Sequence, residues 1–342
     1  MMVRMAVLGV LCFSITGSAE PQPCSNGAGD ILDAKDQPTF RVRTTEHFTL
    51  HYNTTHETAN DLVPHMESTY QAVWSFCQDL KLAIKAPAQS LSIYLFDDAK
   101  EYRSFCEKEG VRCDGVQGTY VANLNAVLLL NVLRHEAMAA LNAPGQDAAN
   151  PQWMRERDAF VKSYNRLVVR HEIAHQLLFN IGALNRNAIY PDWLLEGLAC
   201  LFEPDWPVNP NADLILNQDR LADLRDSLVG TSSPNEREVR KRLGDDRGRL
   251  LSLRTVAANP EAVADAGQFA VYRYAQAWMT TLYLYVEKKE QFAGYLGEMS
   301  GRGGARLMDA DELLIFEQHF GPLNEGADKE FQAFLFHCMR SP

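Results

Sequence analysis

Apolar and polar residues alternate along the first third of the chain, and this alternation predicts strands. The period of two is clearest from Phe40 to Thr44 and from Phe48 to Asn53, as expected of strands that bury one face. Three further strands are predicted by short apolar runs at Ser90–Phe96, Gly118–Val121 and Ala126–Asn131.

Apolar residues at three- and four-residue spacing predict helices between and after these strands. Two of them run from Glu57 to Leu82 and from near Asp98 to Lys108, and a longer one follows from Pro151 to about Ile181. From Tyr190 onward the spacing is helical almost throughout, with no second group of strands. The pattern predicts an α+β protein, with an N-terminal α/β lobe around a small mixed sheet and a C-terminal helical lobe.

The long helix is expected at the junction of the two lobes, which places the first in residues 37–182 and the second in residues 183–342. The formal net charge of -11 argues against nucleic acid as a partner, because phosphate binding requires a concentrated positive surface. These patterns do not determine the oligomeric state.

The N-terminus has the features of a secretory signal peptide. Arg4 precedes an apolar run from Ala6 to about Ile15, which is too short to span a membrane. We predict that residues 1–19 are a signal peptide cleaved after Ala19, that residues 20–36 are a flexible leader, and that the protein is secreted, periplasmic or extracellular. No other segment approaches the length of a membrane span, so none is expected.

The cysteine count agrees with export. Seven cysteines are present, and loss of Cys12 with the signal peptide leaves six, enough for three disulfide bonds. The sequence does not choose among the possible pairings, although Cys106 and Cys113 are placed to close a short loop.

The stretch VVRHEIAHQLLF, residues 168–179, puts two histidines four positions apart on the long helix. Residues at this spacing lie on one helix face, so the rings of His171 and His175 can point at one metal ion. Glu172 is rotated by about 100 degrees from His171 and flanks that point. Zinc hydrolases use two imidazole ligands and a nearby carboxylate in this way. The alternative is a core helix whose two histidines are satisfied by ordinary hydrogen bonds.

A catalytic zinc ion needs a third protein ligand. A histidine six residues after His175 is excluded, because that position is Ile181. The next candidate is Glu196 in YPDWLLEGLACLFEP, residues 190–204, which predicts a short helix. A carboxylate buried between helices is costly unless it is paired or bound to a metal, so Glu196 fits a ligand role.

HEIAH, followed 21 residues after its last histidine by the glutamate of WLLEGLA, resembles the gluzincin zinc peptidases of the peptidase MA-like superfamily, especially uncharacterised secreted bacterial members. The resemblance implies a zincin-like fold in which His171, His175 and Glu196 bind Zn²⁺ and Glu172 is the general base. It also implies a peptide or protein substrate that pairs with an edge strand above the metal, for which Ala126–Asn131 is the candidate.

The chain departs from the family pattern near the ligands. The best-known gluzincins have an aspartate four residues after the ligand glutamate, where it hydrogen-bonds a ligand histidine, and here that residue is Cys200. Glu203, another turn along, or a residue elsewhere must then orient the histidine. For the residue that stabilises the oxyanion, Tyr274 is favoured over Tyr272 and Tyr190.

The sequence thus predicts a secreted zinc metallopeptidase, a hydrolase in which Glu172 takes a proton from the attacking water. Two alternatives stay open. One is a non-catalytic envelope protein that keeps a zincin-like fold for binding, and the other is a zinc amide hydrolase that acts on a non-protein substrate.

Overall fold

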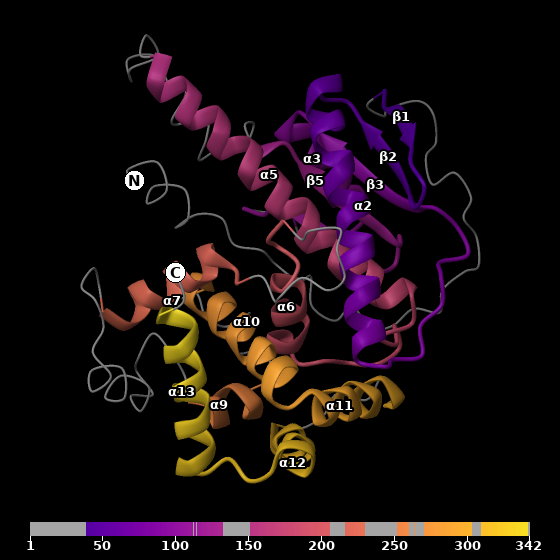
Figure 1. Cartoon of the computed structure of the whole chain (residues 1–342). Helices are drawn as coiled ribbons and strands as arrows, with labels where there is room; N and C mark the ends of the chain where they lie inside the picture. Colours follow the sequence, from indigo (N-terminus) through magenta and orange to yellow (C-terminus); the bar gives the residue numbers. More distant parts are fainter. Residues whose placement is uncertain are drawn as a thin grey trace. The chain divides into compact units, whose positions relative to one another are not determined.

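The computed structural model describes most of the chain between residues 39 and 340 (Figure 1). The described residues are 39–111, 113, 115–132, 151–205, 216–229, 252–259, 263, 270–302 and 309–340. The predicted signal peptide and leader lie outside them. The chain divides into two compact units, Met1–Gln71 with Ala86–Gln176, and Ala72–Lys85 with Leu177–Pro342.

The first unit contains a five-stranded mixed sheet, with the order β1-β2-β3-β5-β4. The parallel pairs are β2 with β3 and β3 with β5, whereas the pairs β1 with β2 and β4 with β5 are antiparallel. The mixed sheet and the α+β class that the sequence predicts are therefore confirmed. The strands are β1 (Arg41–Thr44), β2 (Phe48–Tyr52), β3 (Leu91–Phe96), β4 (Gly118–Val121) and β5 (Ala126–Leu130).

The strand predicted to form the edge of the sheet lies inside it. β5 is paired on both sides, by β3 and by β4, so the expectation that Ala126–Asn131 is an edge strand is wrong. All five residues of β5 are buried, and its sequence AVLLL is the continuous apolar run typical of a strand covered on both faces. Among the described strands, the edge on this side is β4, which pairs Gly118 with Leu129 and Val121 with Ala126.

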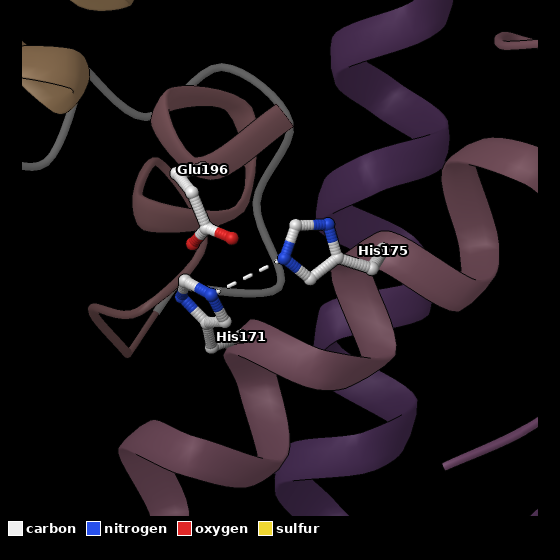
Figure 2. A group of neighbouring side chains, drawn as sticks. All are labelled: His171, His175 and Glu196. Atoms are coloured by element: carbon white, nitrogen blue, oxygen red, sulfur yellow. Dashed lines mark hydrogen bonds between the residues drawn. The ribbon is translucent and has the colours of Figure 1, made fainter. Parts of the chain in front are cut away.

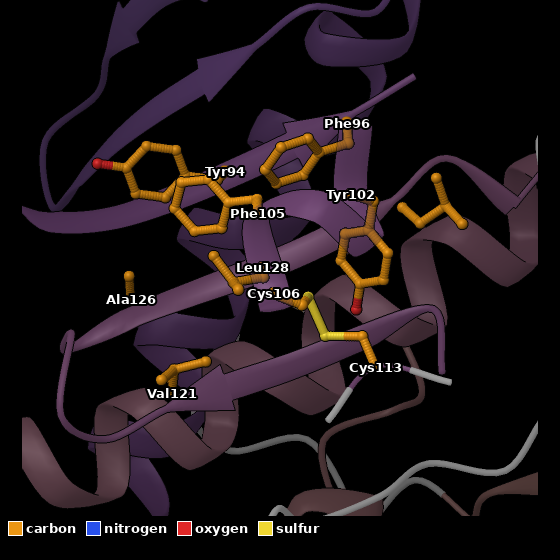
Figure 3. Close-up of a cluster of buried hydrophobic side chains, with 10 residues drawn as sticks. Tyr94, Phe96, Tyr102, Phe105, Cys106, Cys113, Val121, Ala126 and Leu128 are labelled. Carbon is orange, nitrogen blue, oxygen red and sulfur yellow. A yellow bond between two sulfur atoms is a disulfide. The ribbon is translucent and has the colours of Figure 1, made fainter. Parts of the chain in front are cut away.

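Helix α3 (Ala99–Lys108) covers one face of this sheet (Figure 3). Asp98 caps it, because its side chain accepts hydrogen bonds from the backbone N–H groups of Lys100 and Glu101. The disulfide between Cys106 and Cys113 closes the loop that follows, as predicted. The buried residues of this cluster are Tyr94, Phe96, Tyr102, Phe105, Cys106, Cys113, Val121, Ala126, Leu128 and Leu130.

Helices α2 (His56–Asp79) and α5 (Pro151–Asn180) lie mostly in the first unit, where polar pairs join them side by side. Lys162 Nζ lies 3.0 Å from Glu57 Oε1, and one turn later Arg166 forms a two-point ion pair with Asp61. In the next turn Arg170 Nη1 is 3.1 Å from His65 Nδ1. Each successive pair lies four residues further along both helices, so the two helices are parallel.

The described part of the second unit is helical. Helix α10 contributes an unbroken buried segment from Arg273 to Leu284. Helix α6 lies against it at Gly197, where an added Cβ would be 2.1 Å from Thr281 Oγ1 and 2.5 Å from the carbonyl oxygen of Ala277. Only a residue without a side chain allows this approach. The helices are α6 (Asp192–Cys200), α7 (Gln218–Val229), α9 (Leu253–Ala258), α10 (Ala270–Glu287), α11 (Lys289–Gly301), α12 (Asp309–Phe320) and α13 (Glu325–Arg340).

The remaining described cysteines, Cys77, Cys200 and Cys338, are buried and form no disulfide among the described residues, and Cys24 lies outside them. The disulfide at Cys106 is compatible with an extracellular protein. Among the helices described, none combines the length and the hydropathy that crossing a membrane requires.

Candidate metal centre

His171 and His175 face one another from successive turns of α5. Their Nε2 atoms are 3.2 Å apart, and the exposed fractions of the two residues are 1% and 7%. Two nitrogen ligands at the usual zinc distance in a tetrahedral site are about 3.3 Å apart. The distance between the two Nε2 atoms therefore fits a shared zinc ion. It fits equally well a hydrogen bond in which one Nε2 carries the hydrogen and the other accepts it.

The part of α5 that carries the histidine pair is buried on all sides. Residues 168–178 are all buried, the polar Arg170, Glu172 and Gln176 among them. A metal ion held here would lie in a low-dielectric environment, where its charge acts strongly on nearby polar groups.

Glu172 is also buried, with 4% of its surface exposed. Its Oε2 accepts a hydrogen bond of 2.8 Å from the backbone N–H of Tyr120 in β4. The sequence singled out Glu172 but not Tyr120, because a backbone donor 52 residues away leaves no mark in the local sequence.

Glu196 lies on α6 and is 2% exposed. His171, His175 and Glu196 form a buried group that can hold a metal ion, since each offers one ligand atom and these atoms all lie within 4.8 Å of one another (Figure 2). The ligand roles of the three residues stay a prediction. His171 also forms such a group with Cys200 and Glu203.

Glu203 is held by a buried network in the second unit. Its Oε1 accepts hydrogen bonds from Arg220 Nη2 at 2.6 Å and from the Cys200 thiol at 3.4 Å. Its Oε2 accepts from Arg220 Nε at 2.9 Å and from Asn217 Nδ2 at 2.6 Å. Burial alone would lower the pKa of Arg220, but the charge of Glu203 and its hydrogen bonds raise that pKa above its usual value. Arg220 is therefore charged in the folded protein.

The sequence predicted Glu203 near the ligands but missed Arg220 and Asn217. Asn217 precedes α7 and Arg220 lies in its first turn, and no motif connects them with Glu203. A buried glutamate without an obvious partner was the available indication that a basic residue must lie nearby.

The tyrosines considered for the oxyanion lie in different surroundings. The ring of Tyr274 packs under the guanidinium of Arg220, with 5.3 Å from Cζ to the ring centroid. The hydroxyl of Tyr190 donates a hydrogen bond to Ser300 Oγ at 3.0 Å and accepts one from the backbone N–H of Asn185 at 2.7 Å. These contacts give Tyr190 a structural role in the second unit, and the role of Tyr274 stays a prediction.

A third group, at the surface of the first unit, comprises Glu46, His47 and Glu67. Here Glu67 accepts a hydrogen bond from the backbone N–H of His47 at 3.1 Å and binds its Nδ1 at 2.6 Å, while the imidazole stacks on Tyr70 at 3.5 Å. These contacts explain the group as part of the packing of α2 against the turn between β1 and β2.

Comparison with known proteins adds one match. Residues 165–304 match a family described as a protein of unknown function, DUF1570, and this segment contains both HEIAH and WLLEGLA. No curated protein matches the chain.

Proposed function

We propose that this protein is an exported zinc-dependent peptidase of the gluzincin type. One observation carries the proposal. The buried imidazoles of His171 and His175 bring their Nε2 atoms within 3.2 Å of one another, and Glu172, which follows His171 in the sequence, is buried as well. A core helix that merely tolerates two histidines would not require Glu172 to be buried beside them.

His171, His175 and Glu196 would hold the ion in this proposal. Glu196 is 2% exposed, and its carboxylate offers the third ligand atom of the group that it forms with the two histidines. Two imidazoles and one carboxylate form a ligand set typical of catalytic zinc, which leaves a coordination position for water or substrate.

A bound zinc ion would polarise the scissile carbonyl and make water acidic enough to react near neutral pH. Glu172 would accept the proton of the attacking water and pass it to the leaving amine. Tyr274 is the proposed donor to the oxyanion, and Glu203 with Cys200 is proposed to orient His171.

The proposal is tested with purified protein, elemental analysis and a library of fluorogenic peptides. Glu172→Gln should keep its zinc and lose turnover by at least about a thousandfold, as expected when a general base is removed from an assembled site. His171→Ala and Glu196→Ala should lose zinc. Glu156→Gln is the matched control, because Glu156 is an exposed glutamate on the same helix.

The outcomes separate the alternatives. Full zinc retention by both His171→Ala and Glu196→Ala contradicts the ligand set. Wild-type cleavage by Glu172→Gln contradicts the assigned base. Zinc binding without cleavage of any peptide would favour the binding protein or the amide hydrolase of a non-protein substrate.

A further inference from the structure

We infer that the edge strand β4 positions Glu172: the backbone N–H of Tyr120 holds one carboxylate oxygen, and Gly118 leaves the space that the side chain occupies. The inference deepens the proposed function, on which it rests for the role of Glu172 as a base. All the contacts that carry it lie within the first unit.

The N–H of Tyr120 points away from the rest of the sheet. Leu130 N donates to Gln117 O at 2.7 Å, and the register pairs Gly118 with Leu129. In an antiparallel pair the residues that bond to the partner strand alternate, so Tyr120 directs its N–H outward. Its hydrogen bond to Glu172 Oε2 therefore does not replace any hydrogen bond between β4 and β5.

Gly118 is required on the same strand for a steric reason. A Cβ at this position would lie 2.5 Å from Val168 Cγ1 and 2.9 Å from Glu172 Cγ. Both distances are shorter than van der Waals contact, so any larger residue would push α5 or the stem of Glu172 away from the strand.

Gln176 fixes the next turn of the helix to the sheet. Its Nε2 donates to the carbonyl oxygens of Asn125 at 2.9 Å and Ser92 at 3.1 Å, and the residue is fully buried. Glu172 and Gln176 are four residues apart and lie on one face of α5. This face is therefore bonded to the sheet at two successive turns, which limits how far Glu172 can move.

The N–H of Tyr120 fixes one oxygen of the Glu172 carboxylate. A hydrogen bond from an N–H to a carboxylate is charge-assisted and stronger than a neutral one. The bond holds Oε2 in place and so limits the rotation of the carboxylate that is proposed to accept the proton. Tyr120 acts through its backbone and Gly118 through its lack of a side chain, so both are positioning residues.

The contact is tested by NMR on protein labelled with ¹⁵N-tyrosine. The chain has 12 tyrosines, so the spectrum contains few amide signals. Tyr120→Phe removes one amide signal and so assigns it. Glu172→Ala should shift that signal and speed its hydrogen exchange by about tenfold or more, as expected for loss of one hydrogen bond to a charged group. Glu156→Ala, on the exposed part of the helix, is the control. An unchanged Tyr120 signal in Glu172→Ala overturns the inference.

The catalytic consequence is tested on whichever fluorogenic peptides the wild type cleaves. Tyr120→Pro removes the outward N–H and is tolerable on an edge strand. It should lower kcat about ten- to a hundredfold while zinc content and KM stay near wild type. Tyr120→Ala keeps the N–H and should retain most of the kcat that Tyr120→Pro loses. Equal kcat in the two variants overturns the inference.

A second variant covers misfolding of Tyr120→Pro. Gly118→Ala keeps every N–H of β4 and should lower kcat with zinc retained, because it displaces Glu172. Full kcat in folded Gly118→Ala also overturns the inference. The NMR result depends on neither zinc nor turnover, whereas equal cleavage by wild type and Glu172→Gln contradicts the peptidase proposal. The two failures are therefore distinguishable.

Discussion

Arg220 binds both carboxylate oxygens of Glu203, with Nη2 2.6 Å from Oε1 and Nε 2.9 Å from Oε2. The side chains are 7% and 1% exposed, so the pair is withdrawn from water. It joins the residues just after α6 to α7, and through Cys200 it reaches the helix that carries Glu196.

Breaking this pair should strongly destabilise the second unit. Glu203→Ala leaves the charge of Arg220 buried without its carboxylate, and we expect the free energy of unfolding to fall by about 3–5 kcal/mol in urea titrations. The double variant Glu203→Leu with Arg220→Met should be less destabilised than Glu203→Ala, because no buried charge remains. Glu325→Ala breaks the exposed pair with Lys329 and is the control, for which no measurable change is expected. A Glu203→Ala protein as stable as this control would contradict the prediction.

Removal of the metal should lower thermal stability. A zinc ion bound to the folded state alone stabilises by about 4 kcal/mol when its free concentration is a thousand times Kd. We expect a chelator to lower the Tm of the wild type by several degrees, and added zinc to restore it, in differential scanning calorimetry. The Tm of a protein with both His171→Ala and His175→Ala should respond to neither. A wild-type Tm that the chelator leaves unchanged would argue against a bound ion.

Gly197→Ala should destabilise the packing of α6 on α10. The new methyl group would meet the carbonyl oxygen of Ala277 at 2.5 Å, and backbone does not move aside as a flexible side chain does. We expect a loss of about 1–3 kcal/mol in the free energy of unfolding, and weaker zinc binding because Glu196 is the adjacent residue on α6. Gly297→Ala is the matched control: a Cβ there meets nothing within 4 Å, so alanine should be neutral or slightly stabilising. Equal stability of the two variants would contradict this prediction.

The ion pair of Asp61 with Arg166 should stabilise the folded protein at neutral pH and lose this effect in acid. The hydrogen bond from Arg166 lowers the pKa of Asp61, although partial burial opposes this shift. A lowered carboxyl pKa stabilises the folded state fully above the unfolded pKa, about 3.9, and the contribution is lost as pH falls through the folded value. Asp61→Asn should therefore be less stable than wild type by about 1 kcal/mol or less at pH 7, and the difference should vanish in acid. A difference that persists at low pH would show that the charge of Asp61 is not its cause.

The local periodicity of the chain predicted most helices and strands, because apolar spacing depends only on neighbouring residues. The pairing of His171 with His175 is of this kind, since the pitch of a helix places residues four apart on one face. WLLEGLA predicted a short helix with a glutamate on it for the same reason. Charge and the signal-like N-terminus likewise required no knowledge of the fold.

The contacts between distant segments needed the tertiary structure. Which strand lies at the edge of the sheet depends on pairing between segments that are far apart in the chain. Among the described strands β4 lies at that edge, and β5 lies between β3 and β4. The N–H that holds Glu172 and the arginine that holds Glu203 are 52 and 17 residues away from them. The cysteine count allowed three disulfides, whereas Cys77, Cys200 and Cys338 are buried and form no disulfide among the described residues. A residue pattern records the short-range geometry of helices and strands, but a hydrogen bond across the fold forms only when packing brings its two ends together.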